Sequence, residues 1–230
     1  MNLALNTLTA EETYKLLTGT VVPRPIAWIT TLSASGIVNL APFSCYTIVS
    51  TMPPLLGVNM GRKAGVRKDT ANNAIASGEF VVNIGTEDMV AAIHQSAVEH
   101  APEVSEVELL GLTLEACVDV RVPRLAHVPI SMECRLRQVI PFGDTGAEFV
   151  VGEVLRLHAQ DGVLAGGKID SARLRPVCRL VGQLTVHWDA LFNNQRSHRR
   201  PRVYMGCSPK SASISSANDT SVASAKSIGH

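Results

Sequence analysis

The sequence predicts a mostly β protein, a β-barrel of antiparallel strands with peripheral helices. Two long segments, 130–140 and 148–158, are rich in the β-branched residues that favour strands. A Gly-Asp-Thr-Gly sequence at 143–146 provides the turn between them. No Gly-x-Gly-x-x-Gly motif opens a helix after a strand, so a doubly wound dinucleotide-binding sheet is not expected.

Composition limits the class of protein. The chain has 230 residues, of which 46% are hydrophobic, enough for one sizeable core. A net charge of +1 gives no general attraction to nucleic acid or to a membrane surface. No signal peptide and no bilayer-spanning run is expected. The five cysteines form no Cys-x-x-Cys pair, which argues against disulfides and zinc and favours a cytoplasmic location.

The first elements expected are a helix and a hairpin. Thr9 and Glu12 have the spacing of a capping box, so a helix should begin there and end at Gly19. The segment 25–32 contains an apolar run, 26–31, that ends in two hydroxyls, and residues 37–42 follow a Ser-Gly turn. Together these two segments predict a β-hairpin.

Pro42 is expected to interrupt that hairpin. Proline has no N–H for the ladder, so the chain should bulge or leave the sheet there. Backbone groups freed at such a break, with the nearby hydroxyls of Ser44, Thr47, Ser50 and Thr51, would form a cradle without carboxylates. Such a cradle suits a flat, polar, uncharged ring system.

Three of the cysteines are expected to be packed in the core, and Cys45 is a candidate for the cofactor site. Cys117, Cys134 and Cys178 lie among apolar residues and are expected to be packed thiols. Cys45 lies inside the expected cradle. It is either another small buried residue or a thiol beside a bound ring, and the sequence leaves both open.

Residues 68–70, Lys-Asp-Thr, lie at the start of a helix expected at about 67–76. Amide groups at a helix N-terminus, together with a lysine and a threonine, can hold a phosphate. The alternative is an ordinary polar cap on a surface helix.

The segment 99–110 contains four glutamates and is interpreted as a solvated acidic linker, with a mobile lid as the alternative. A helix should precede it, capped at 86–88. His94 and His100 are not spaced to share a helix face, so no metal site is expected. Further strands are expected at 55–60, 80–84, 114–120 and 185–188.

The middle of the strand at 130–140 alternates in polarity. Met132 and Cys134 alternate with Glu133 and Arg135, which is typical of a sheet with one solvated face. The barrel domain is expected to span 1–192. The tail at 193–230, rich in Ser and Ala after a short basic run, is expected to be disordered.

Several motifs occur in a fixed order. Residues 24–31 read Arg-Pro-Ile-Ala-Trp-Ile-Thr-Thr, and Gly-x-x-Asn-Leu-Ala-Pro-Phe-Ser, Ser-x-x-Pro-Pro and Lys-Asp-Thr follow. This ordered set resembles the flavin reductase-like, FMN-binding split-barrel family over about residues 10–187. The resemblance implies an antiparallel Greek-key split barrel and a homodimer with FMN near the subunit interface. It also implies NADH or NADPH as the electron donor.

The resemblance also implies which residues bind the cofactor. Residues near the ring and its ribityl chain would include Thr30, Thr31, Asn39, Ala41, Pro42, Ser44, Cys45, Ser50 and Thr51. Arg62, Lys68 and Thr70 would bind the phosphate, with Asp69 orienting the loop. His158 would face the nicotinamide side, or else be a packed strand-end histidine. No side chain is expected to act as a catalytic acid or base, because the cofactors carry the reaction.

These motifs imply an NAD(P)H:flavin oxidoreductase that supplies reduced flavin to a partner such as a monooxygenase. Two alternatives remain open from the sequence. One is a tightly FMN-bound electron-transfer or ferric-reductase-like flavoprotein. The other is a barrel that binds flavin without turnover.

Overall fold

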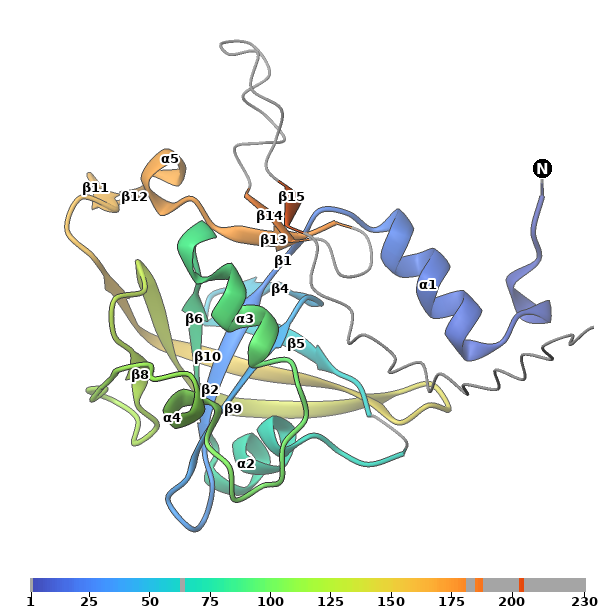
Figure 1. Ribbon diagram of the computed structural model, residues 1–230, viewed down its shortest axis with the longest axis horizontal. Helices are drawn as coiled ribbons and strands as arrows, with labels where there is room; N and C mark the ends of the chain where they lie inside the picture. The colour runs from blue at the N-terminus through green and yellow to red at the C-terminus, as the bar shows by residue number, and fades with distance from the viewer. Residues whose placement is uncertain (1, 63–64, 181–184, 188–202, 205–230) are drawn as a thin grey trace, which may run out of the picture.

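The computed structural model describes residues 2–62, 65–180, 185–187 and 203–204, and they form a curled antiparallel sheet with helices around it (Figure 1). The sheet has seven strands in the order β3-β2-β6-β9-β10-β5-β4. The strands are β2 (Ala27–Leu32), β3 (Val38–Phe43), β4 (Tyr46–Thr51), β5 (Pro54–Met60), β6 (Glu79–Ile84), β9 (Ile130–Phe142) and β10 (Ala147–Ala159).

Strands that are far apart in the sheet contribute side chains to one hydrophobic core. Phe43 of β3, Val58 of β5 and Phe80 of β6 pack in the same buried cluster, so the sheet curls around its inner face. Among the described strands no ladder joins β3 to β4, and the barrel is open between them. The predicted mostly β barrel with peripheral helices is therefore confirmed.

The long β9–β10 hairpin supplies the curvature. Its ladder shifts register at Val151/Gly152 and again at Val154/Arg156, and such bulges bend and twist a strand. At Gly152 a Cβ atom would lie 2.4 Å from Cζ of Phe80. Glycine there allows the Phe80 ring to fill the barrel interior.

Helix α1 (Ala10–Thr20) begins at the predicted capping box. The Glu12 N–H donates to Thr9 Oγ1 over 3.2 Å, and the Thr9 N–H donates to Glu12 Oε2 over 2.9 Å. The helix ends at Thr20, one residue beyond Gly19. The other helices are η1 (Leu5–Thr7), α2 (Asp69–Ser77), η2 (Glu87–Met89), α3 (Val90–Gln95), α4 (Glu106–Leu109) and α5 (Ser171–Leu174).

Short strands complete the fold. β1 (Arg24–Pro25) pairs with β13 (Val177–Arg179), followed in order by β14 (Thr185–His187) and β15 (Val203–Tyr204). Two further pairs are β7 (Leu114–Glu115) with β8 (Arg124–Leu125), and β11 (Leu164–Ala165) with β12 (Lys168–Ile169). Apart from β15, the tail expected to be disordered lies outside the described residues, as does Trp188. The disorder stays a prediction.

The expected interruption at Pro42 was wrong. Pro42 pairs with Trp28 in an unbroken β2–β3 ladder. The reason is that β3 is an edge strand. The Val38 carbonyl accepts a hydrogen bond from Ser105 Oγ, and the Leu40 N–H donates to Glu106, so alternate backbone groups of β3 face away from β2. Pro42 shares their parity, and its missing N–H is not needed by the ladder.

The expectation of a solvated acidic linker at 99–110 was wrong for residues 105–107, which are buried, whereas Glu99, Glu103 and Glu108 are exposed. Ser105 Oγ donates to the Val38 carbonyl over 2.7 Å, and the Leu40 N–H donates to Glu106 Oε2 over 2.9 Å. Glu106 and Val107 are buried. This segment supplies the partners that an exposed sheet edge otherwise lacks.

Two further strand assignments were wrong. Residues 114–120 contain only the two-residue strand β7, and the loop after it covers Glu133, which is fully buried and not on a solvated face. Residues 46–51, for which no strand was predicted, form strand β4. The remaining predicted strands at 55–60, 80–84, 130–140 and 148–158 are confirmed.

Candidate functional site

A buried hydrogen-bond network joins the first hairpin to helix α2. Asn39 Nδ2 donates to Thr70 Oγ1 over 2.9 Å and lies 3.5 Å from Thr31 Oγ1. Asn73 Nδ2 also donates to Thr31 Oγ1, over 3.3 Å. The structure thus brings together three of the predicted site residues, Thr31, Asn39 and Thr70, from three different elements.

This network changes the place of Thr70. The Thr70 side chain is only 1% exposed and already accepts a hydrogen bond from Asn39. It therefore anchors the first turn of α2 to the first hairpin and does not face solvent. The residues that α2 presents outward at its start are Lys68 and Asp69. Lys68 Nζ lies 5.2 Å from the centre of the Phe43 ring, which places the ammonium group beside the end of β3.

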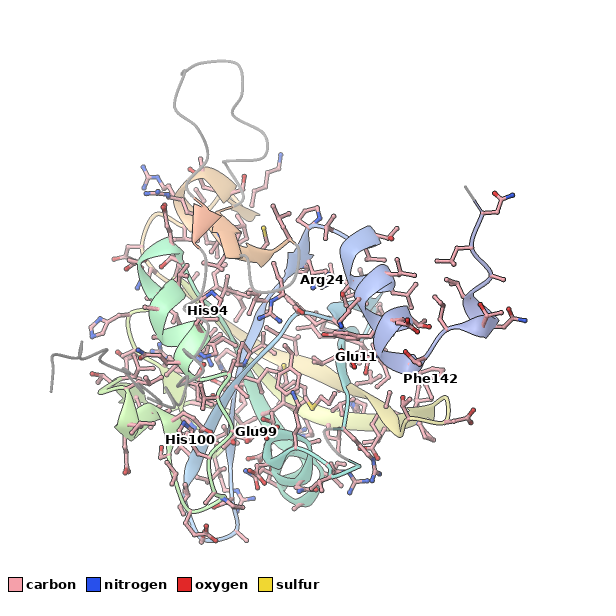
Figure 2. All side chains as sticks on the ribbon, turned by 45° about the vertical axis from the view of Figure 1, so that its right-hand side comes forward. Glu11, Arg24, His94, Glu99, His100 and Phe142 are labelled. Atoms are coloured by element: carbon pink, nitrogen blue, oxygen red, sulfur yellow. The ribbon has the colours of Figure 1, made fainter. Side chains whose placement is uncertain are left out.

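Acidic residues lie near the same helix start. Burial raises the pKa of Asp69, and the nearby carboxylates of Glu103 and Glu99 raise it further. Figure 2 shows Glu99 on the segment beside α2. The N-terminus of α2 therefore combines a lysine with a local excess of negative charge.

The chain leaves the sheet at Ser44 and Cys45. The Asn59 N–H donates to the Cys45 carbonyl over 2.8 Å, and Arg24 Nε donates to Ser44 Oγ over 3.4 Å. Cys45 is exposed, so its interpretation as a packed thiol was wrong, whereas Cys134 and Cys178 are buried.

Sequence reasoning missed Arg24. It is 5% exposed, and its guanidinium donates to the carbonyls of Thr18 and Val21 at the end of α1 (Figure 2). Because carbonyls at a helix C-terminus lack partners within the helix, a cation is stabilised there. Arg24 therefore ties α1 to the chain at Ser44.

Strand alternation separates other predicted residues. Thr31, Asn39 and Ala41 lie on the inner face of the hairpin, whereas Thr30 and Pro42 lie on the outer face. Thr30 Oγ1 donates to the Pro123 carbonyl over 2.8 Å. The prediction grouped these residues in one lining, and the structure divides them between two faces of the sheet.

Ser50, Thr51 and Arg62 lie toward the other edge of the sheet. Ser50 Oγ accepts a hydrogen bond from the Met52 N–H over 3.2 Å, and Thr51 pairs with Pro54. Arg62 Nε donates to the Gly146 carbonyl over 3.1 Å. The Arg62 side chain therefore contacts the β9–β10 turn.

His158 is far from the first hairpin along the sheet. The ladder pairs His158 with Ser131, Ser131 with Asn83, Asn83 with Trp28, and Trp28 with Pro42. Four strand spacings of about 4.8 Å amount to roughly 19 Å along the sheet. Three strands, β9, β6 and β2, therefore lie between His158 on β10 and the strand that leads to Ser44.

His158 instead pairs with Glu133. Its Nε2 lies 2.5 Å from Glu133 Oε1, and the carboxylate also accepts the N–H groups of Val118, Asp119 and Val120 at 2.9, 2.6 and 3.1 Å. Burial raises the pKa of Glu133, but the N–H donors and His158 outweigh it and hold that pKa below its usual range. Glu133 is therefore a stabilised, buried carboxylate.

Cys117 lies beside this pair. Its sulfur, a Glu133 oxygen and a His158 nitrogen all lie within 4.8 Å of one another, a donor set that could hold a metal ion. However, the carboxylate is already bound by three N–H groups and His158. Burial and Glu133 raise the pKa of Cys117 to about 12, which favours the protonated thiol. The group is a closed hydrogen-bonded cluster.

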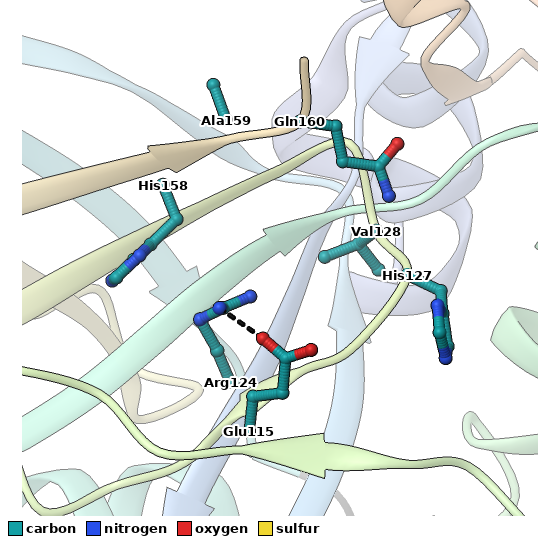
Figure 3. A pocket seen from close by; sticks show the side chains of 7 residues that line it. All are labelled: Glu115, Arg124, His127, Val128, His158, Ala159 and Gln160. Atoms are coloured by element: carbon teal, nitrogen blue, oxygen red, sulfur yellow. Dashed lines mark ion pairs between the residues drawn. The ribbon is translucent and has the colours of Figure 1, made fainter.

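A pocket of about 370 Å³ opens next to His158 (Figure 3). Across the β7–β8 pair, Glu115 is opposite Arg124 and forms an ion pair with it. The pocket is lined by Glu115, Arg124, His127, Val128, His158, Ala159 and Gln160. The sequence offered Arg124 as a residue that could meet a 2′-phosphate, but it did not indicate the pocket as a whole, because the lining residues come from segments that only the fold brings together.

Asn83 connects the hairpin to this second region. It is fully buried, and its Nδ2 donates to the Trp28 carbonyl over 3.0 Å and lies 3.3 Å from Thr30 Oγ1. Its Oδ1 accepts the Leu125 N–H over 3.0 Å and Ser131 Oγ over 2.9 Å. One amide thus fixes β2, β8 and β9 relative to one another.

Comparisons with known proteins agree on one family. The model of the "Flavin reductase like domain" matches residues 18–187. An uncharacterized protein of Halalkalibacterium halodurans is 45% identical over 201 residues, covering 85% of this chain and 96% of that protein. No helix within the described residues is long and apolar enough to cross a membrane.

Two solved structures are also similar. The structure of nitrilotriacetate monooxygenase component B from Bacillus cereus has a TM-score of 0.79 and 39% identity, covering 81% of this chain and 95% of that one. A flavin reductase-type structure with a split barrel domain from Shewanella frigidimarina has a TM-score of 0.72 and 22% identity, covering 80% and 92% of the two chains. The second likeness shows that the fold is a split barrel.

Proposed function

Because the chain belongs to the flavin reductase-like family, we propose that it binds FMN and acts as an NAD(P)H-dependent flavin reductase. In this proposal NADH or NADPH supplies the electrons, and reduced flavin passes to a partner enzyme such as a monooxygenase. The likeness to a protein named as component B of a monooxygenase supports this role.

The observation that carries the proposal is the network of Thr31, Asn39 and Thr70. It fixes the start of α2, and with it Lys68, beside the end of β3 where the chain leaves the sheet. The exposed ammonium group of Lys68 and the first N–H groups of α2, which this buried network holds in place, form a donor set that fits the phosphate of a flavin nucleotide.

Different residues would bind the phosphate and the ring of FMN. Lys68 and the first N–H groups of α2 would hold the phosphate, since both favour an anion. The segment at Ser44 and Cys45 would hold the ring through backbone groups. When bound, the flavin accepts a hydride from the nicotinamide, so that no side chain has to act as a general acid or base.

The test is optical. The protein as purified, or after incubation with FMN, should show a bound flavin spectrum that NADH or NADPH bleaches under anaerobic conditions. A flavin that binds but is bleached by neither donor would contradict the reductase proposal and favour a binding barrel. Release of reduced flavin on dilution distinguishes a reductase that serves a partner from a tightly bound electron-transfer protein.

The first prediction concerns Lys68. Lys68→Ala should weaken FMN binding by roughly 10- to 100-fold, the effect of losing one charge-assisted hydrogen bond, and should leave riboflavin binding nearly unchanged. Glu103→Gln should act in the opposite direction, because it removes a negative charge near the same helix start. Flavin fluorescence titration measures both. An equal loss for FMN and riboflavin would contradict the phosphate assignment.

A homodimer is part of the proposal. Helix α1 has no buried residue, and Figure 1 shows it standing away from the sheet. Its Tyr14 and Leu17 are exposed, as are Ile48 (70%) and Met52 (89%) on and just after β4. A second copy of the chain, which the family resemblance implies, would cover this apolar surface.

The second prediction follows from that surface. Ile48→Glu should dissociate the dimer at micromolar concentration, because burying an unpaired carboxylate in an interface costs several kcal/mol. Val118→Glu, at an exposed valine outside α1 and β4, is the matched control and should remain dimeric. Sedimentation velocity measures both, and a monomeric wild-type protein would overturn the dimer.

A further inference from the structure

Apart from His158, the residues that line the pocket of Figure 3 are not among those assigned to the flavin. Trp28 of the first hairpin packs with Leu125 and Val128 in one buried cluster, and Val128 also lines the pocket. The pocket walls come from β7, β8, the loop after β8 and the end of β10. A ligand there would make its own contacts.

Arg124 gives the first indication of what that ligand is. Its Nε is buried and has no hydrogen-bond partner among the described residues, although its Nη2 pairs with Glu115. Buried donors in folded proteins nearly always have a partner, and one left without a partner destabilises the fold. Arg124 also lines the pocket, so its guanidinium is a donor group whose hydrogen bonds a ligand in the pocket can complete.

The other walls also offer donors and are held in place. His127 lines the pocket with a φ of 64°, a left-handed conformation that non-glycine residues seldom adopt. The backbone on either side is fixed, because the Ala126 N–H donates to the Thr113 carbonyl over 2.8 Å and the Gln160 N–H donates to the Pro129 carbonyl over 2.9 Å.

Glu115 decides which anions can bind. A ligand must compete with this carboxylate, which lies opposite Arg124 in the β7–β8 ladder and is already in contact with it. A monocarboxylate carries no more charge than Glu115 and has no advantage over it. A phosphate monoester carries about −1.5 to −2 charges at pH 7 and has three strong acceptor oxygens, so it can share or displace the ion pair.

We propose that this pocket is a binding site for a phosphate monoester, with Arg124 as the principal donor, His127 and Gln160 as further donors, and Glu115 as a competitor within the site. The volume of about 370 Å³ leaves room for the body of a small ligand beside its phosphate. Two sources share this chemistry: the 2′-phosphate of NADPH, and a separate phosphorylated small molecule.

Calorimetric titration of the full-length protein with 2′-AMP, at constant ionic strength, tests the site. The wild-type protein should bind 2′-AMP and should not bind adenosine. Arg124→Gln should weaken binding by roughly 10- to 100-fold, the usual effect of a lost charge-assisted bond. Arg121→Gln is the matched control, because Arg121 lies three residues away and its guanidinium faces Glu79.

Glu115→Gln is expected to change 2′-AMP affinity in the opposite direction. It removes the competitor and should tighten 2′-AMP binding several-fold, and it keeps the proposal testable if Arg124→Gln fails to fold. Absence of 2′-AMP binding in both the wild-type protein and Glu115→Gln would overturn the site. Equal losses in Arg121→Gln and Arg124→Gln would also overturn it.

Competition identifies the source of the phosphate. Displacement of 2′-AMP by NADPH and not by NADH would support the site and assign it to the electron donor. Lack of displacement by either, with 2′-AMP still bound, would support the site and assign it to a separate phosphorylated ligand. The titration does not depend on flavin reduction, so failure of the proposed function would leave this result intact.

Discussion

Glu133→Gln is expected to destabilise the protein by roughly 3–5 kcal/mol, because hydrogen bonds to a buried charged group contribute about 1.5–3 kcal/mol each and Glu133 accepts several. The glutamine is almost isosteric, so the effect comes from hydrogen bonding. Glu133 accepts from three consecutive backbone N–H groups and pairs with His158. A glutamine has one acceptor oxygen, and its NH₂ group would face N–H groups that are themselves donors.

Urea unfolding at pH 7 measures this loss. Glu108→Gln, at an exposed glutamate of α4, is the control and should change the free energy of unfolding by no more than about 0.5 kcal/mol. A loss below about 1 kcal/mol for Glu133→Gln would contradict the assignment of Glu133 as the group that holds the loop at 118–120.

The same carboxylate predicts a pH dependence. Its pKa is lowered in the folded protein, so folding favours the ionised form. The stabilisation is complete above the ordinary pKa of a glutamate and is lost as the pH falls through the lowered value. The difference in unfolding free energy between the wild-type protein and Glu133→Gln should therefore shrink below about pH 4.

Asn83→Leu is expected to destabilise the protein by about 3–5 kcal/mol. The change leaves the Leu125 N–H and Ser131 Oγ without their acceptor and removes the donor to the Trp28 carbonyl, and each unsatisfied buried group costs about 1–3 kcal/mol. Thr30 also loses a neighbour 3.3 Å away.

The location of Asn83 gives this variant a second readout. Leu125 follows Arg124, so loosening its backbone should also weaken 2′-AMP binding in the pocket. Asn72→Leu, at an exposed position of α2, is the matched control for both measurements. Retention of wild-type stability in Asn83→Leu would contradict the role of this amide in joining β2, β8 and β9.

Local signals predicted much of the fold correctly. The capping box at Thr9 and Glu12, the first hairpin and the long strands at 130–140 and 148–158 depend on contacts between near neighbours in the chain. Such contacts are readable from residue type and spacing. The family resemblance added the split barrel, which the comparisons confirm.

The errors had a common physical cause. Pro42 stays in β3 because β3 is an edge strand, and the 99–110 segment is partly buried because it covers that edge. Glu133 is buried because a loop distant from it in sequence closes over it. In each case the partner is remote in sequence, and residue patterns do not encode which strand will be at an edge.

In the candidate site, too, some features follow from the sequence and others only from the tertiary structure. The sequence by itself determined a flavin-family barrel with hydroxyl, amide and lysine groups in a recognisable order. The tertiary structure decided that Thr31, Asn39 and Thr70 share one network while Thr30 and Pro42 face the other side of the sheet. It also created the Arg124 pocket. Strand order and register set these distances, and both arise only when distant segments pair.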